Sequence, residues 1–224
     1  MTGRRLVLLR HGRTAWNAER RFQGHLDPPL DEVGRAQAYE VGALVAAMRP
    51  DLMVSSTLSR AVQTAGIVAD VAGLPFTTDV RFRERGLGHW EGHTLDEVAA
   101  AYPEEYGEWA AGQDVERRGG ETRDEVAHRS LAALAELPEV PLTVVVTHGA
   151  TAMSTANALL GIAQRTHPLA PLANCHWTEL VAEPVPAGRP PRWRVRGHNL
   201  GAPGAVVPLP THPVSADGTT DADA

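Results

Sequence analysis

The sequence predicts an α/β fold: a three-layer sandwich in which a mainly parallel central sheet is flanked by helices, with a short helical insertion over the strand ends. Short apolar runs suited to buried strands alternate along the chain with segments of helical periodicity. Alternation of this kind is typical of βαβ units and a parallel sheet. The chain has 224 residues, which is long enough for one such core.

The first half of the chain contains two strand–helix pairs. A strand rich in Leu and Val is expected over residues 4–9, and a second strand over residues 52–54. Helical spacing predicts helices over residues 31–48 and 58–71, and a proline or glycine follows each of them as a stop signal. The apolar side of the first helix is expected to comprise Val33, Ala36, Val41, Leu44 and Val45.

The segment over residues 80–120 is less regular, and we expect it to form a helical insertion that roofs the strand ends. Several aromatic residues concentrate there, and Thr94 with Glu97 has the pattern of a capping box at the start of a short helix. Thr122 with Glu125 is a second capping box, which opens a longer helix.

The last part of the chain completes the sheet and ends in a polar tail. The expected elements are a strand over residues 142–146, a helix over residues 150–160 and late strands near residues 177–181 and 192–196. Residues 1–207 are therefore assigned to a single domain. Residues 208–224 are rich in Pro, Thr, Asp and Gly, a composition that predicts a disordered tail.

Composition excludes several classes of function. The formal net charge is -6 and the pI is about 5.9, whereas nucleic acids and anionic membranes bind broad basic surfaces, so we expect neither as a partner. All 21 Lys and Arg residues are Arg, which excludes a P-loop lysine and a Schiff-base lysine. The single cysteine, Cys175, cannot form an intrachain disulfide, and the apolar run from Leu6 to Leu9 is too short for a signal peptide or a membrane span. A cytoplasmic location is expected.

Charged and imidazole side chains follow the predicted strands. Arg10 and His11 come directly after the first strand, and His148 and Gly149 come directly after a later one. Because ligands bind at the carboxyl ends of strands in open α/β sheets, we expect the histidines to face one another. Arg60 follows another strand, in the first turn of a helix, and helix N-termini favour anions. Two arginines, two histidines and a helix end predict a phosphate site.

A longer and highly specific pattern surrounds these residues. In chain order it comprises Arg10-His11-Gly12-Arg13-Thr14, Asn17, Ser55-Ser56, Arg60-Ala61 with Thr64-Ala65, Arg83-Glu84 with Gly88, Trp90-Glu91-Gly92, Gly119-Gly120-Glu121-Thr122 and Thr147-His148-Gly149. The pattern resembles the histidine phosphatase superfamily, also called the phosphoglycerate-mutase-like family, over roughly residues 4–160. The resemblance implies that family's fold and phosphoryl transfer through a phosphohistidine. No cofactor is expected.

The resemblance also implies roles for individual residues. His11 is implied as the nucleophile, and Glu84 as the proton donor to the leaving oxygen and then as the base for water. The residues implied to bind phosphate are Arg10, Asn17, Arg60, His148 and the backbone N–H of Gly149. The further substrate contacts that we expect are Gln23 and Gly24.

The chemistry adds two expectations about the histidines. His11 must attack through an unprotonated nitrogen, so we expect a backbone carbonyl to accept a hydrogen bond from its other ring nitrogen. His148 is expected to be protonated, so that with two Arg side chains it supplies positive charge without a metal.

Metal binding is the competing interpretation of the histidines. His89 and His93 are spaced like a helical zinc pair, but Gly88 and Gly92 interrupt that stretch, and no HExxH motif is present. We therefore expect no catalytic metal. The histidines for which the sequence suggests no partner, and which are expected to have surface or core roles, are His25, His128, His167 and His198.

Two activities within the family stay open, because it includes mutases as well as phosphatases. Family mutases carry a longer, basic, proline-rich insertion, whereas the segment between Gly92 and Gly119 is short and acidic, which favours water as the phosphoryl acceptor. We therefore expect a hydrolase of a small phosphorylated metabolite. The alternatives are a phosphoglycerate mutase and a non-catalytic phosphoester-binding regulatory protein.

The C-terminal part suggests a substrate. Asn174-x-x-Trp177-Thr178-x-Leu180 and Arg192-Trp193-Arg194 are similar to a subgroup of actinobacterial phosphatases that act on glucosyl-3-phosphoglycerate. Arg118 departs from the family pattern, which often has Pro or His there. A broad-specificity sugar phosphatase and a ribazole-phosphate phosphatase remain alternatives. The resemblance also implies a homodimer through a late edge strand.

Overall fold

The computed structural model describes residues 3–165, 169–183 and 191–202. Its strands are β1 (Arg5–Arg10), β2 (Leu52–Ser55), β3 (Phe76–Thr78), β4 (Leu142–Thr147), β5 (Trp177–Glu183) and β6 (Arg192–Leu200). Its α-helices are α1 (Ala15–Ala18), α2 (Glu32–Met48), α3 (Ser59–Ala72), α4 (Leu95–Ala101), α5 (Pro103–Ala110), α6 (Arg123–Glu136) and α7 (Gly149–Leu160). Its 3-10 helices are η1 (Val80–Phe82), η2 (Gly88–Trp90) and η3 (Glu116–Arg118).

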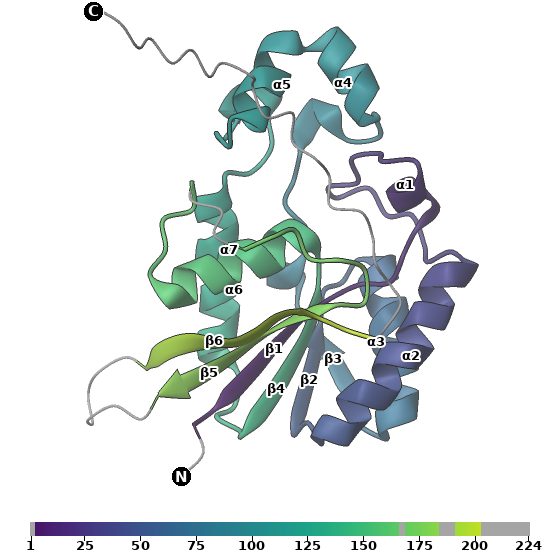
Figure 1. The fold of residues 1–224 in the computed structure, drawn as a ribbon, viewed down its shortest axis with the longest axis vertical. Coiled ribbons are helices and arrows are strands. Elements are labelled where there is room, and N and C mark those ends of the chain that lie inside the picture. The colour runs from purple at the N-terminus through teal and green to yellow at the C-terminus, as the bar shows by residue number, and fades with distance from the viewer. Residues whose placement is uncertain (1–2, 166–168, 184–190, 203–224) are drawn as a thin grey trace, which may run out of the picture.

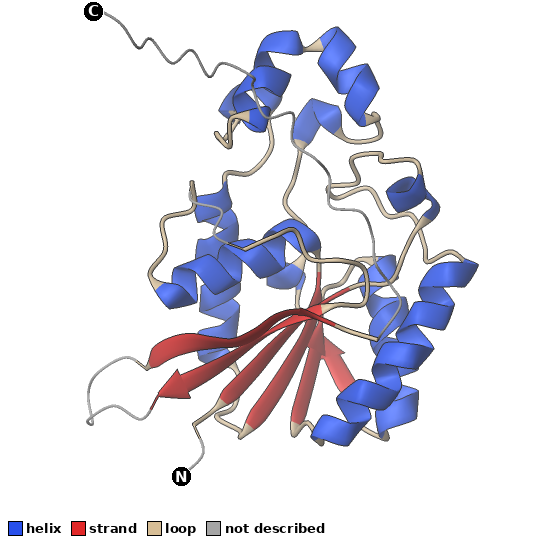
Figure 2. Cartoon of the chain, viewed as in Figure 1, coloured by secondary structure: helices blue, strands red, loops and turns tan. Residues whose placement is uncertain are grey.

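The strands form one sheet in the order β3-β2-β4-β1-β5-β6 (Figure 2). The pairs β3–β2, β2–β4 and β4–β1 are parallel, whereas β5 is antiparallel to β1 and β6 is antiparallel to β5. Helices cover both faces (Figure 1). The predicted three-layer α/β fold with a mainly parallel sheet is confirmed.

Two separate cores explain the layers, because alternate side chains of a strand point to opposite faces of the sheet. Val7 and Leu9 of β1 pack in one core with α2 and α3, whereas Leu6 and Leu8 pack in the other with α6 and α7. The neighbouring strands β1 and β4 therefore send their following helices to opposite faces of the sheet. That divergence is a topological switch point, the place where open α/β sheets bind ligands.

The packed face of α2 differs from the expectation. Val33 is 43% exposed and Ala36 is also exposed. The buried residues of this helix are Gly34, Ala38, Val41, Gly42 and Val45. The reason is a close backbone contact: a Cβ at Gly34 would lie 2.0 Å from the Arg13 carbonyl oxygen. The helix turns Gly34 inward because the loop after β1 passes directly against it, and it turns Gly42 inward against Val71 of α3.

Most other elements fall where they were predicted, and both capping boxes are present. Among the described α-helices and strands, α1 and β3 were missed: α1 has four residues and β3 has three, and neither leaves room for a periodic pattern. The predicted tail over residues 208–224 lies outside the described residues, so the tail and the single-domain boundary stay predictions.

The insertion forms a small cluster of its own. Trp90, Val98 and Val115 are buried in it, and the partly buried residues that pack against them are Phe22, Leu87, Tyr102, Tyr106 and Trp109. Figure 1 shows α4 and α5 at the end of the molecule toward which β1 runs, so they stand over the site-bearing edge of the sheet. No helix in the described part of the chain has the length and hydropathy that a membrane span requires.

Candidate active site

His11 lies in the loop that follows β1, and its ring is almost fully buried. Its Nδ1 lies 2.7 Å from the Gly12 carbonyl oxygen, which can only accept, so Nδ1–H donates and Nε2 is left unprotonated. Burial and the positive charges of Arg60 and Arg10 hold the pKa of His11 well below its usual range. The predicted backbone carbonyl is present, and His11 is a neutral imidazole with one free ring nitrogen.

The backbone around His11 is fixed from three sides. The His11 N–H donates to the Thr147 carbonyl oxygen (2.9 Å), which ties the loop to the end of β4. The Gly12 N–H donates to Thr64 Oγ1 on α3 (3.0 Å). Asn174 Nδ2 donates to the His11 carbonyl oxygen (3.1 Å) from the segment before β5. The imidazole is therefore held in place before any ligand binds.

His148 follows β4, and its ring centroid lies 5.1 Å from that of His11, with the planes tilted by 58°. Its Nδ1 accepts a hydrogen bond from Arg60 Nε (3.2 Å), so its Nε2–H donates to Ser56 Oγ (2.8 Å). Burial and the positive charge of Arg60 hold the pKa of His148 well below its usual range. The expectation of a protonated His148 is wrong for this structure, because an Arg donor occupies the nitrogen that would carry the extra proton.

Arg60 is fully buried in the first turn of α3. Besides the bond to His148, Nη1 donates to the Leu26 carbonyl oxygen (2.7 Å) and Nη2 donates to the Gly24 carbonyl oxygen (2.9 Å). Burial lowers the pKa of Arg60 to about 10, so that its guanidinium stays charged at neutral pH. The charge is fixed at the end of the sheet beside both histidines.

Arg10 supplies the second guanidinium. Its Nη1 donates to the Leu172 carbonyl oxygen (2.5 Å), while its buried Nε has no hydrogen-bond partner among the described residues. A Cβ built on Gly149 would lie 3.7 Å from this Nε, which places the start of α7 beside the Arg10 guanidinium. A buried N–H without a partner is costly, so this donor is available to an anion.

Glu84 lies against the N-terminus of α7. Its Oε1 accepts hydrogen bonds from the N–H groups of Arg85 (2.8 Å) and Thr151 (3.1 Å), and its Oε2 accepts one from the Ala150 N–H (3.3 Å). The carboxyl group caps a helix whose own N-cap residue, His148, makes no side-chain cap. Glu84 therefore reaches the same helix end as Gly149.

The remaining predicted contacts surround the loop after β1. Asn17 Oδ1 accepts hydrogen bonds from the Thr14 N–H (3.1 Å) and from Asn174 Nδ2 (3.2 Å). Gln23 Oε1 accepts a hydrogen bond from Thr14 Oγ1 (3.2 Å), and Gly24 contacts Arg60 through its carbonyl oxygen. These bonds use the oxygen atoms of the three residues, and their predicted contacts with phosphate and substrate stay predictions.

The structure adds residues to which the sequence gave no role. Ser56 and Thr64 were part of the motif pattern, but nothing in it showed that they contact His148 and the Gly12 N–H. Asn174 reaches His11 across 163 positions of sequence, a separation that no local pattern reveals. The Leu172 carbonyl oxygen belongs to the same incoming segment.

Two of the other histidines, His25 and His198, have partners that the sequence did not suggest. His25 contacts the Glu84 carbonyl oxygen and Glu121, and His198 contacts Thr178 Oγ1 and the Ala170 carbonyl oxygen. His89 pairs with Glu105, His128 is exposed, and His167 lies outside the described residues. Within residues 3–165, 169–183 and 191–202, no group of three or more His, Cys, Asp and Glu side chains is placed to hold a metal ion.

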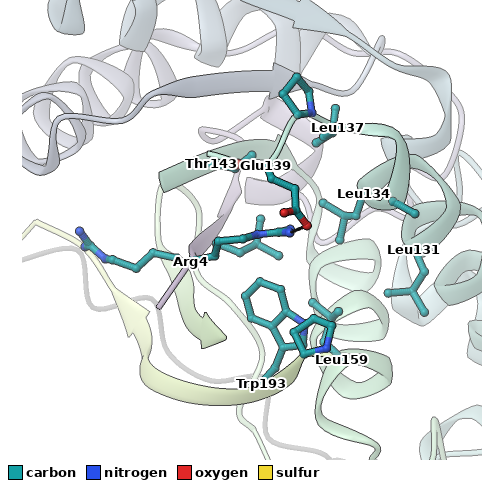
Figure 3. Close-up of a pocket in the computed structure, with 13 residues that line it drawn as sticks. Arg4, Leu131, Leu134, Leu137, Glu139, Thr143, Leu159 and Trp193 are labelled. Atoms are coloured by element: carbon teal, nitrogen blue, oxygen red, sulfur yellow. Dashed lines mark hydrogen bonds and ion pairs between the residues drawn. The ribbon is translucent and has the colours of Figure 1, made fainter. Parts of the chain in front are cut away.

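A separate cavity of about 360 Å³ lies at the opposite end of β1 and β4 (Figure 3). Its lining residues are Arg4, Arg5, Leu6, Leu131, Leu134, Ala135, Leu137, Pro138, Glu139, Thr143, Leu159, Pro191 and Trp193. None of the predicted site residues lines it, and Arg4 and Glu139, which both line it, are paired with each other.

The fold and the site together define an α/β protein in which two guanidinium groups and a neutral imidazole meet at the ends of the parallel strands, and comparisons with known proteins give its family. The model of the histidine phosphatase superfamily (branch 1) matches residues 6–187. A glucosyl-3-phosphoglycerate phosphatase of Mycolicibacterium vanbaalenii is 38% identical over 219 residues, covering 90% of this chain and 97% of that protein. A protein of Salmonella paratyphi C described as a probable phosphoglycerate mutase, GpmB, is 35% identical over 178 residues, covering 76% of this chain and 81% of that protein.

Solved structures show the same likeness. A mycobacterial glucosyl-3-phosphoglycerate phosphatase in complex with VO3 superposes with a TM-score of 0.79 at 36% identity, covering 88% of this chain and 99% of that chain. The chain therefore belongs to the histidine phosphatase superfamily. It is a phosphomonoester hydrolase, and the predicted resemblance is confirmed.

The lowered pKa values of His11 and His148 predict how stability depends on pH. A histidine with a depressed folded pKa stabilises the protein fully above its unfolded pKa, about 6.5, and this stability is lost as the pH falls below that value. We expect the urea midpoint of unfolding to decrease from about pH 6.5 to 5, and to decrease less steeply in His148→Asn. Parallel curves for the two proteins would contradict the assignment of His148 as a buried neutral group.

Proposed function

We propose that the protein hydrolyses a small phosphate monoester through a phosphohistidine on His11, without a metal. The observation that carries the proposal is the neutral His11 ring, whose free Nε2 lies in a site with the fully buried guanidinium of Arg60 and the buried Nε of Arg10. Phosphoryl transfer depends mainly on positioning and on stabilising the charge of the phosphoryl oxygens. Arg60 and Arg10, whose Nε has no hydrogen-bond partner in the described part of the chain, supply that charge.

The proposed reaction has two steps. His11 Nε2 attacks the phosphorus, the bond to the leaving oxygen breaks, and Glu84 donates a proton to that oxygen. Glu84 then removes a proton from a water molecule whose oxygen attacks the phosphorus, so that the N–P bond breaks and free His11 returns. Glu84 suits both steps because its carboxyl group lies at the start of α7, close enough to Arg10 and Arg60 to interact with their charges.

We propose glucosyl-3-phosphoglycerate as the substrate, because relatives named for that activity match nearly the whole chain. Purified protein is expected to release phosphate from this ester with a kcat/KM at least about tenfold above that for 3-phosphoglycerate. A chelator should leave the rate unchanged. Faster release from another ester would overturn the substrate, and loss of activity with chelator would overturn the metal-independent route.

The mutase alternative is tested in the same assay. The likeness to the GpmB protein favours it, whereas the acidic insertion favours water as the acceptor. A mutase would interconvert phosphoglycerate isomers in the presence of a bisphosphate primer and release little phosphate. Binding of the esters without turnover would instead indicate a regulatory binding protein.

We also propose a homodimer that forms in the cytoplasm. β6 is the edge strand on its side of the sheet, and two of its residues, Val195 and Leu200, are exposed apolar side chains. An edge strand offers unpaired backbone groups to a second copy of the chain.

A further inference from the structure

The segment between α1 and α2 carries a histidine that joins two parts of the site. Gly24 and Leu26 both turn their carbonyl oxygens to Arg60, the buried phosphate-site arginine. Between them, His25 turns its ring the other way, and Nε2 donates to the Glu84 carbonyl oxygen (2.8 Å). Three consecutive residues therefore connect Arg60 with the backbone of Glu84.

The backbone of Glu84 is held by a second donor on the same oxygen. Arg129 Nη2 donates to the Glu84 carbonyl oxygen (3.1 Å), and Arg129 Nη1 donates to the carbonyl oxygens of Arg81 (2.6 Å) and Arg83 (2.9 Å). Arg129 thus comes from α6 and grips the chain leading into Glu84. His25 donates to the same Glu84 oxygen from the segment between α1 and α2, and we call His25 and Arg129 together the Glu84 clamp.

Glu121 joins the two halves of the clamp. Its carboxylate accepts hydrogen bonds from Arg129 Nε (2.8 Å) and from the Gly86 N–H (2.8 Å), and it lies 3.5 Å from His25 Nε2. The Glu121 carboxylate beside the ring raises the pKa of His25. Partial burial opposes ionisation of Glu121, but its interactions with His25 and Arg129 still hold its pKa well below its usual range.

The segment itself cannot shift easily. Gly24 has a φ of +49°, and a Cβ on it would collide with the Glu91 carboxylate 2.1 Å away. The same carboxylate accepts hydrogen bonds from the N–H groups of His25 (3.1 Å) and Leu87 (2.8 Å). Two carboxylates therefore interact with His25: Glu91 with its backbone and Glu121 with its ring. The ring also shares the Glu84 carbonyl oxygen with the positively charged Arg129, which donates to the same atom.

We propose that His25 is a positioning residue for the reaction, which acts by holding the backbone of Glu84 in register with the phosphate site. This inference rests on the proposed role of Glu84 as proton donor. His25 does not touch the phosphate donors with its ring, so its loss should affect proton delivery and not phosphate binding. The effect should depend on how much the leaving group needs a proton.

The test compares an alkyl phosphate with p-nitrophenyl phosphate, whose phenolate leaves without protonation. We measure kcat/KM, because it reports the steps up to phosphorylation of the enzyme. His25→Ala should lower kcat/KM for the alkyl ester roughly 10- to 100-fold and leave the aryl ester within about twofold. His25→Gln, whose amide N–H replaces the donor, should restore most of the loss. The exposed His128→Ala is the matched control.

A double-mutant cycle shows whether His25 acts through Glu84. Glu84→Gln should give the same selective loss, and adding His25→Ala to it should lower the alkyl-ester rate little further. An equal loss on both esters, or full additivity with Glu84→Gln, would overturn the positioning role alone. Absence of phosphate release by the wild-type protein would overturn the proposed function itself. His25→Phe, which keeps the ring without the donor, repeats the test if the alanine variant unfolds.

Discussion

Replacing His11 with alanine is expected to abolish phosphate release while leaving the fold intact. Removal of a catalytic nucleophile commonly costs roughly 10⁴- to 10⁶-fold in kcat. The ring makes one hydrogen bond, to the carbonyl oxygen of the next residue, whereas the loop is held by bonds of its backbone. The variant should therefore unfold at a temperature close to that of the wild-type protein.

Rapid acid-free quenching identifies the intermediate. The wild-type protein should acquire an acid-labile, base-stable phosphate on mixing with substrate, and His11→Ala should acquire none. His148→Ala provides a comparison, because it removes the facing ring but keeps the nucleophile. Turnover by His11→Ala above a small residual rate, or a phosphorylated group elsewhere in the chain, would reject His11 as the nucleophile.

Replacing Arg60 with methionine is expected to damage both activity and stability. The variant keeps much of the side-chain volume but removes the donors to Gly24, Leu26 and His148. A buried acceptor left without a partner costs about 1–3 kcal/mol, so the orphaned carbonyl oxygens alone should lower the free energy of unfolding by about 3 kcal/mol. Loss of a preorganised charge at the phosphate should reduce kcat/KM by about 10²- to 10³-fold.

Denaturant unfolding and steady-state kinetics on the same preparations separate these two effects. Arg35→Met is the matched control, since Arg35 is an exposed arginine on α2. A stable Arg60→Met protein with normal activity would show that the buried guanidinium serves neither purpose. A stable Arg60→Met protein with low activity would show that Arg60 acts on the phosphate and does not stabilise the fold.

The sequence predicted that His11 and His148 lie together, because the neighbours of each residue in the chain decide its position. His11 and His148 each follow a clear apolar strand, and parallel strands end at one edge of a sheet. Their approach to 5.1 Å follows from strand order, which the paired motifs were enough to suggest.

The prediction failed where contacts between distant elements decide the outcome. The neutral state of His148 depends on Arg60, 88 positions away, and the partners of His25 come from the insertion and its flanks. The inward face of α2 depends on the chain passing beside Gly34, which hydrophobic periodicity does not report. Such features can be determined only from the tertiary structure, because they depend on contacts between residues far apart in the sequence.

The pairing of β1 with β4 has a consequence for biosynthesis. In the parallel register Arg10 lies beside Thr147, so the loop that carries His11 gains its partner strand only after most of the described chain has been translated. A slip of one residue would displace the imidazole by about 3.3 Å from its neighbour and reverse the faces of the strand. Nascent fragments that end before β4 should consequently be inert toward phosphoesters, and the appearance of activity should mark closure of the sheet's centre.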